Sequence, residues 1–129
     1  MIKGIGVDTV RISEILRFMG EDGLSSPFIR RTFTPAEQLE GLTRPQPAEY
    51  FASRFAAKEA VFKAVAHLLP EKTFDLRIIE TLNDRDGSPY VTADETLCPI
   101  LDRAGIDALH ISITTEADFA TAFVIAELK

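Results

Sequence analysis

The alternation of apolar and polar residues predicts strands at both ends of the chain. An extended backbone turns alternate side chains to opposite faces. One face of residues 2–10 then carries Gly4, Gly6 and Asp8, and the opposite face is mostly apolar. Glycines in a strand often mark a place where another backbone or a ligand comes close.

Two further strands are predicted near the end of the chain. Residues 109–115 alternate cleanly between apolar and polar, and residues 119–128 are mostly apolar. The short segment Glu116-Ala117-Asp118 between them predicts a turn. We therefore expect these two strands to pair as an antiparallel hairpin.

A long central helix is predicted over residues 48–69, ended by Pro70. At helical spacing its large apolar residues form one stripe, made of Phe51, Phe55, Phe62, Val65 and Leu69. Its small residues form a second face, made of Ala52, Ser53, Ala56, Ala57, Ala60 and Ala64. Small residues allow close packing, so we expect this face to meet the glycines of the first strand and to bring Asp8 near the helix.

Shorter elements lie between these. The pattern predicts helices over 12–20, 35–41 and 95–105, and strands over 74–82 and 90–93. Thr34, Pro35 and Glu37 form a strong helix start, because threonine caps, proline takes the first position and glutamate reaches back. Ser13 is a possible cap for the first helix, and Asp86-Gly87 predicts a tight turn. The fold class is α+β, with an antiparallel sheet packed on the long central helix in a single domain, 1–129.

Composition favours a soluble globular protein. Of the 129 residues, 46% are hydrophobic and 26% charged. No apolar run reaches the ~18 residues of a membrane span, and the N-terminus lacks the pattern of a secretory signal. A single cysteine, Cys98, permits no internal disulfide, so we expect a cytoplasmic protein with no membrane partner. The net charge of −6 argues against nonspecific nucleic-acid binding.

Four charges on the long helix are candidates for chemistry. Arg54 and Lys58 lie one turn apart at the aromatic stripe, and such a pair of cations suits phosphate. Glu59 and Asp8 form a carboxylate pair of the kind that holds Mg²⁺. Ordinary alternatives stay open, since Glu59 and Lys63 form a common i,i+4 ion pair and Lys58 could extend past the phenylalanines to water.

The segments GIGVD (4–8) and RFAAKEAVFKA (54–64) narrow these alternatives. With FTPAE (33–37), DGSPYV (86–91) and the closing HISIT…DFATAFVIAE segment, the chain resembles the 4′-phosphopantetheinyl transferases of the holo-acyl-carrier-protein synthase type over nearly its whole length. The resemblance implies Mg²⁺-dependent transfer of phosphopantetheine from coenzyme A to a serine of an apo acyl carrier protein, with release of 3′,5′-ADP. It also implies a homotrimer whose sites are shared between adjacent subunits.

The resemblance also assigns residues. Asp8 and Glu59 match the metal-binding carboxylates, and Lys63 joins them as a catalytic residue. Matching positions predict coenzyme A contacts at Arg54, Lys58, Lys63, His67, Ser88 and Thr115. The first helix region implies carrier-protein docking by Arg11 and Arg17, with Arg30 and Arg31.

Several positions depart from the family pattern. Residues 66–68 replace a glycine-rich turn, Ser88 replaces a lysine and Thr115 replaces a histidine. An acidic residue and an arginine usually found three positions apart are reversed here as Arg11 and Glu14. The alternative to an active transferase is therefore a catalytically weakened family member that binds a carrier protein or a partner.

Overall fold

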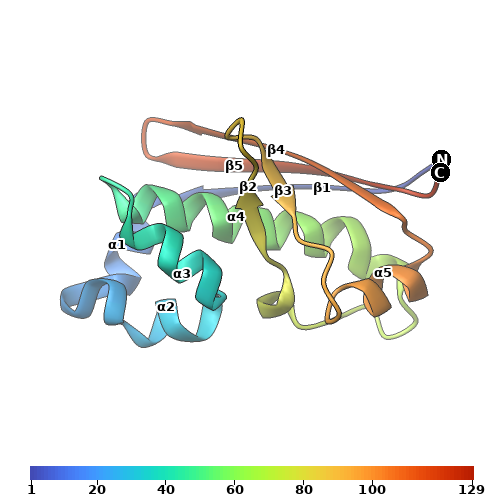
Figure 1. Cartoon of the computed structure of the whole chain (residues 1–129), viewed down its shortest axis with the longest axis horizontal. Helices are drawn as coiled ribbons and strands as arrows, with labels where there is room; N and C mark the ends of the chain where they lie inside the picture. Colours follow the sequence, from blue (N-terminus) through green and yellow to red (C-terminus); the bar gives the residue numbers. More distant parts are fainter.

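The computed structural model describes residues 1–129 and has the expected α+β architecture (Figure 1). The strands are β1 (Ile2–Arg11), β2 (Thr81–Asn83), β3 (Pro89–Val91), β4 (Ala108–Glu116) and β5 (Phe119–Glu127). The helices are α1 (Ile12–Met19), α2 (Pro27–Thr32), α3 (Pro35–Leu42), α4 (Pro47–Val65) and α5 (Cys98–Ala104). Three 3₁₀ turns complete the chain: η1 (Gly20–Ser25), η2 (Ala66–Leu68) and η3 (Leu76–Ile78).

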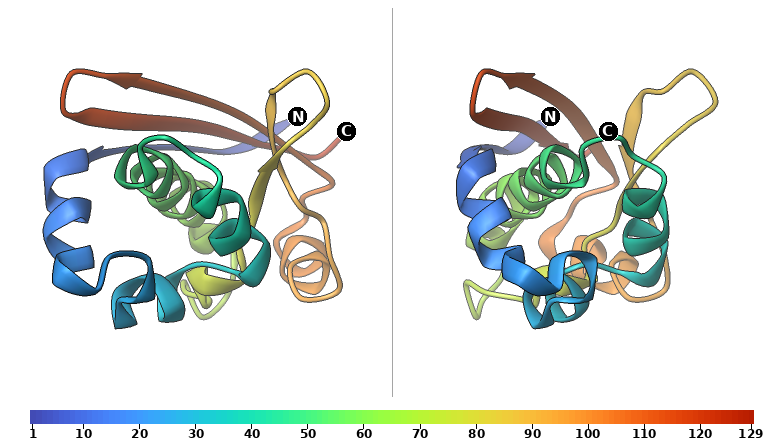
Figure 2. Two further views of the ribbon diagram at one scale, coloured as in Figure 1. Left: turned by 60° about the vertical axis from the view of Figure 1, so that its left-hand side comes forward. Right: turned by 90° about the vertical axis from the view of Figure 1, so that its left-hand side faces the viewer.

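A three-stranded antiparallel sheet covers one side of α4 (Figure 1). The strand order is β1-β5-β4, so the first strand and the fourth form the two edges. The separate β2-β3 hairpin and α3 lie on the opposite side of α4 from α1 (Figure 2). None of the helices combines the length and the apolar content needed to cross a lipid bilayer.

The predicted contact between glycines and alanines holds β1 on α4. A Cβ added to Gly4 would lie 1.9 Å from the carbonyl oxygen of Ala64, and one added to Gly6 would lie 1.9 Å from that of Ala60. Only hydrogen fits at either position. The two backbones are therefore in direct contact, and this contact fixes the distance between Asp8 and helix α4.

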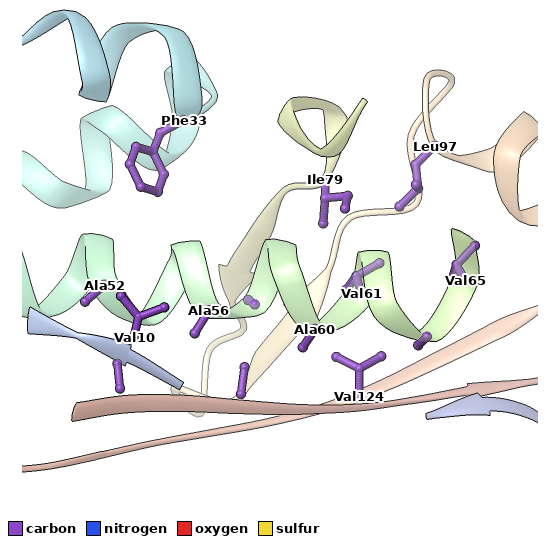
Figure 3. Packing of buried hydrophobic residues seen from close by; sticks show 14 of the residues in the cluster. Val10, Phe33, Ala52, Ala56, Ala60, Val61, Val65, Ile79, Leu97 and Val124 are labelled. Carbon is purple, nitrogen blue, oxygen red and sulfur yellow. The ribbon is translucent and has the colours of Figure 1, made fainter. Parts of the chain in front are cut away.

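The hydrophobic core surrounds α4 on both sides (Figure 3). The alanine face packs against the sheet, where Val10 and Val124 are buried. The other side of the helix packs against segments that cross it, which contribute Phe33, Ile79 and Leu97. A helix buried on two sides is central to its fold, as the sequence predicted.

Two local predictions were wrong, and one helix was not predicted. Residues 74–80 do not form a strand, because Asp75 accepts a hydrogen bond from the Arg77 backbone and starts the 3₁₀ turn η3. Ser13 does not cap α1; its backbone and hydroxyl instead donate to the carboxylate of Asp118, at 3.0 and 2.6 Å. Helix α2 was missed, although Ser26 caps it with Pro27 at its first position.

We predict that Gly6→Ala destabilises the protein. A new methyl group must displace the Ala60 carbonyl, so the free energy of unfolding should fall by about 3 kcal/mol or more. Urea denaturation measures this change. The exposed substitution Ser25→Ala is the control, and equal stability of the two variants would contradict the close contact.

Candidate functional site

An acidic pair and a lysine meet where β1 crosses α4. The ammonium group of Lys63 lies 2.9 Å from Oδ1 of Asp8 and donates to the carbonyl oxygen of Val7 at 3.1 Å. Partial burial raises the pKa of Glu59, the negative charge of Asp8 raises it further, and Lys63 opposes both effects. The two carboxylates are therefore close enough to repel each other.

Local structure explains this cluster. Asp8 shares the inward face of β1 with Gly6, which the Ala60 contact presses onto α4. Glu59 and Lys63 lie one turn apart along α4. The ring of His67, four residues further on, lies beside Gly4 at the start of β1, 3.0 Å from where a Cβ of that residue would be. The structure thus brings His67 to the side of the helix that carries the acidic pair.

The acidic pair fits a magnesium ion. Mg²⁺ prefers oxygen ligands and is often held by one or two carboxylates, with water and substrate phosphates as the other ligands. No group of three or more His, Cys, Asp or Glu side chains gathers into a fuller metal-binding set. Repulsion between Asp8 and Glu59 would be relieved by a divalent cation placed between them.

A second cluster surrounds Tyr50 on the other side of α4. Two guanidinium groups stack on its ring, with the Cζ atoms of Arg44 and Arg54 at 5.0 and 4.6 Å from the ring centroid. Arg54 also donates to the Asn83 side chain at 2.9 Å. Tyr50 Oη and Arg54 Nε are buried without a hydrogen-bond partner. Two stacked cations and unused donors suit an anion.

This cluster lines a cleft of about 560 Å³ between the start of α4, the β2-β3 hairpin and β4. Its lining residues include Arg44, Glu49, Tyr50, Arg54, Asn83, Gly87 and Thr115. The hydroxyl of Thr115 donates to Glu49 at 3.2 Å. Ser88 is exposed at the tip of the hairpin, between the lining residues Gly87 and Pro89.

Sequence reasoning missed Arg44, Tyr50 and Asn83 as cleft residues. Arg44 precedes α4 in a connector that showed no motif, and Asn83 lies on the distant hairpin. One signal was available for Tyr50, which lies one turn before Arg54 and so stacks against it.

Lys58 is not placed to bind phosphate, so that prediction needs correction. Its side chain is fully buried and forms an ion pair with the equally buried Glu37, with 2.8 Å between Nζ and Oε1. It also donates a hydrogen bond to the carbonyl oxygen of Ile79. Burial lowers the pKa of Lys58, and the charge of Glu37 opposes this shift. Lys58 does not extend to water either, and its partner was not foreseen.

The acidic pair and the cleft lie on opposite sides of α4. At 100° per residue, Glu59 and Lys63 are rotated by about 140° and 180° from Arg54 around the helix. Asp8 also belongs to the β1 edge of the sheet, whereas Thr115 belongs to the β4 edge, with β5 between them. One chain therefore presents two separate candidate sites that face different directions.

A basic and aromatic surface lies on α1 and α2. Phe18, Pro27, Phe28 and Arg31 line a shallow groove of about 390 Å³. Arg17 is exposed beside Phe18, and Arg30 is exposed on the same short helix as Arg31. The fourth predicted docking residue, Arg11, stacks on Phe119 at 4.9 Å, at the start of α1.

Comparison with known proteins identifies the family. A family model described as the 4′-phosphopantetheinyl transferase superfamily matches residues 4–124. The chain belongs to this superfamily. A curated relative from Trichlorobacter lovleyi, named holo-[acyl-carrier-protein] synthase, is 37% identical over 127 residues, which cover 98% of both chains.

Solved structures from the family share the fold. The holo-[acyl-carrier-protein] synthase of Neisseria meningitidis has a TM-score of 0.83 and 35% identity, covering 98% of this chain and 99% of its own. A synthase from Bacillus anthracis, described in complex with coenzyme A (3′,5′-ADP), has a TM-score of 0.75 and 30% identity, covering 100% and 99%. The α+β fold and the family resemblance are thus confirmed.

We predict that Asp8→Asn lowers the pKa of Glu59. The substitution removes a like charge, so the Glu59 carboxylate forms at lower pH. Side-chain ¹³C NMR of the metal-free protein, recorded across a pH series, measures the change. Asp22→Asn removes an exposed carboxylate elsewhere and should leave Glu59 unaffected. An unchanged Glu59 titration in Asp8→Asn would show that the two acids are not neighbours.

Proposed function

We propose that this chain transfers the 4′-phosphopantetheine group of coenzyme A to a serine hydroxyl of an apo acyl carrier protein. The serine oxygen forms a bond to the β-phosphorus, the diphosphate bridge breaks, and 3′,5′-ADP leaves. The observation that carries this proposal is the acidic pair beside Lys63, found together with a cationic cleft in a chain of the transferase superfamily.

Asp8 and Glu59 are the proposed magnesium ligands. When bound, Mg²⁺ supplies positive charge against the diphosphate and stabilises the leaving oxygen. Lys63 bonds to Asp8 in the free chain and lies half-exposed beside it. Its ammonium group is therefore available to orient a phosphate oxygen at the same place. His67 lies on the same side of α4 as the acidic pair, beside Gly4.

The cleft is the proposed subsite for the nucleotide end of coenzyme A. Arg54 and Arg44 offer charged donors, although Arg44 also pairs with Glu40 at 2.9 Å, and the buried Arg54 Nε and Tyr50 Oη still lack partners. A phosphate group would use both donors and both charges. Thr115 lines this subsite in place of the family histidine, and Ser88 lies at its rim in place of the lysine.

A homotrimer would unite the acidic pair of one chain and the cleft of another as the two half-sites of one active site. Because the acidic pair and the cleft face opposite sides of one chain, a single coenzyme A reaches both only when a second copy contributes its cleft. The outer face of the sheet supports such an assembly, since several large apolar side chains are exposed there: Ile5, Val7 and Phe123. A head-to-tail arrangement of this kind closes into a three-membered ring when each copy is rotated by a third of a full turn from the last.

Carrier-protein docking is assigned to the surface on α1 and α2. An acidic carrier protein would require local positive charge on a chain whose net charge is −6. Arg17, Arg30 and Arg31 supply that charge, and the groove between Phe18 and Phe28 adds an apolar contact. Arg11 extends the surface toward the acidic pair, because it ends the strand that carries Asp8.

We predict that Asp8→Asn or Glu59→Gln reduces transfer by at least about a hundredfold, because each removes a charge that holds the metal at the diphosphate. Mass spectrometry of an apo carrier protein, incubated with coenzyme A and Mg²⁺, measures the product. Calorimetry of 3′,5′-ADP with and without Mg²⁺ tests the binding step.

Asp22→Asn serves as the matched control and should retain full activity. Transfer at the parent rate by either site variant would refute the metal assignment. A parent chain that binds carrier protein but transfers nothing would favour the weakened, partner-binding alternative.

We also predict that Arg17→Glu raises the KM for carrier protein and leaves the KM for coenzyme A unchanged. The reversal replaces attraction by repulsion at the docking surface and slows association most at low salt. Arg103→Glu, on α5 at the opposite end of the molecule (Figure 1), is the control. Identical carrier kinetics in the two variants would remove α1 from the docking surface.

A further inference from the structure

We infer that the buried pair Glu37–Lys58 is a positioning device for the coenzyme A cleft. The inference rests on the proposed function of that cleft. Neither side chain reaches solvent, and neither lines the cleft. Their effect on binding therefore passes through the elements that they join.

The pair fastens the segment that leads into the hairpin to two helices. Glu37 belongs to α3, and its carboxylate accepts hydrogen bonds from the backbone N–H groups of Thr34 at 3.0 Å and Thr81 at 3.1 Å. Lys58 belongs to α4 and donates to the carbonyl oxygen of Ile79 as well as to Glu37. Both charges are thus held by backbone groups on either side of residue 80.

A neighbouring contact reinforces this link. The hydroxyl of Thr34 donates to the carboxylate of Glu80 at 2.5 Å. Three successive residues, 79, 80 and 81, are therefore each tied to α3 or α4. The hairpin has only three residues in each strand and its tip extends away from the body of the protein (Figure 2). Strand β3 lies beside β4, and the base at residues 79–81 fixes the other side of the hairpin.

The position of the hairpin matters because it forms a wall of the cleft. Asn83, two residues after the anchored Thr81, holds the guanidinium of Arg54 at 2.9 Å. Gly87 and Pro89 on the same hairpin also line the cleft. Loss of the buried pair would release this wall and misalign Arg54, while the acidic pair on the far side of α4 keeps its geometry.

A buried ion pair is a costly way to stabilise a fold, because an apolar pair of similar volume often does as well or better. An apolar pair, however, would leave the backbone groups of Thr81 and Ile79 without their present partners. The charged pair is therefore suited to holding the base of the hairpin in one position. A measurement of stability alone would not detect this effect on position.

The test compares two variants. Glu37→Gln/Lys58→Met removes both charges together, so neither is left buried alone. Asn83→Ala breaks only the contact between the hairpin and Arg54 and leaves the buried pair intact. In steady-state transfer assays, both should raise the KM for coenzyme A by about fivefold or more, with kcat and the KM for carrier protein within about twofold of the parent.

Leu101→Ala is the control for lost stability. It makes a cavity in α5, which contributes no residue to either half-site, and should lower the unfolding temperature without changing the KM for coenzyme A. Hydrogen exchange at Thr81 should accelerate in the double variant and not in Leu101→Ala.

An unchanged KM for coenzyme A in the double variant would overturn the inference, as would an equal rise in Leu101→Ala. Should the double variant fail to fold, Lys58→Met decides by the same criterion, because it removes the Ile79 anchor and leaves the two backbone hydrogen bonds of Glu37 in place. A parent chain without transfer activity would instead count against the proposed function. The positioning role is then tested by 3′,5′-ADP affinity, which both variants should weaken and Leu101→Ala should not.

Discussion

The direct contact between the backbones of β1 and α4 is the constraint on which the rest of the structure depends. Gly4 and Gly6 leave no side chain between the strand and the carbonyl groups of Ala64 and Ala60. This approach buries the alanine face and closes the sheet over the helix. It also brings Asp8, two residues after Gly6, to Lys63 and Glu59. The glycines thus determine both the packing of the core and the spacing of the acidic pair.

Periodicity was sufficient to predict the sheet, the long helix and the contact between them. It also placed Asp8 beside Glu59, because both faces of that contact have sequence signatures: glycines at spacing two and alanines at spacing four. The segment 74–82 shows the limit of this reasoning. Its apolar residues predicted a strand, but Asp75 bonds to its own neighbours and turns the chain. Local hydrogen bonds between a side chain and the backbone compete with strand formation. They leave the hydrophobic pattern of the segment unchanged, so the pattern does not reveal them.

Strand and helix periodicity predicted that Asp8 lies near the long helix, and the structure shows it beside Lys63. The metal-binding and catalytic roles of Asp8, Glu59 and Lys63 come from the family resemblance and stay predictions. Lys58 was misassigned, since a cation in an aromatic stripe is explained equally well by a ligand or by a buried partner, and the partner Glu37 lies 21 residues earlier in the chain. The cleft residues Arg44 and Asn83 come from a connector and a hairpin, so only the tertiary fold brings them to Arg54.

The central claim is that each chain carries two half-sites that face apart, and that two copies complete one site. Mixing two inactive variants tests it most directly. Asp8→Asn retains its cleft and Arg54→Ala retains its acidic pair, so random mixed assemblies should recover about a quarter of the parent transfer activity. Subunits are exchanged by unfolding and refolding the two variants together. No recovery from an assembly shown to contain both variants would contradict the account.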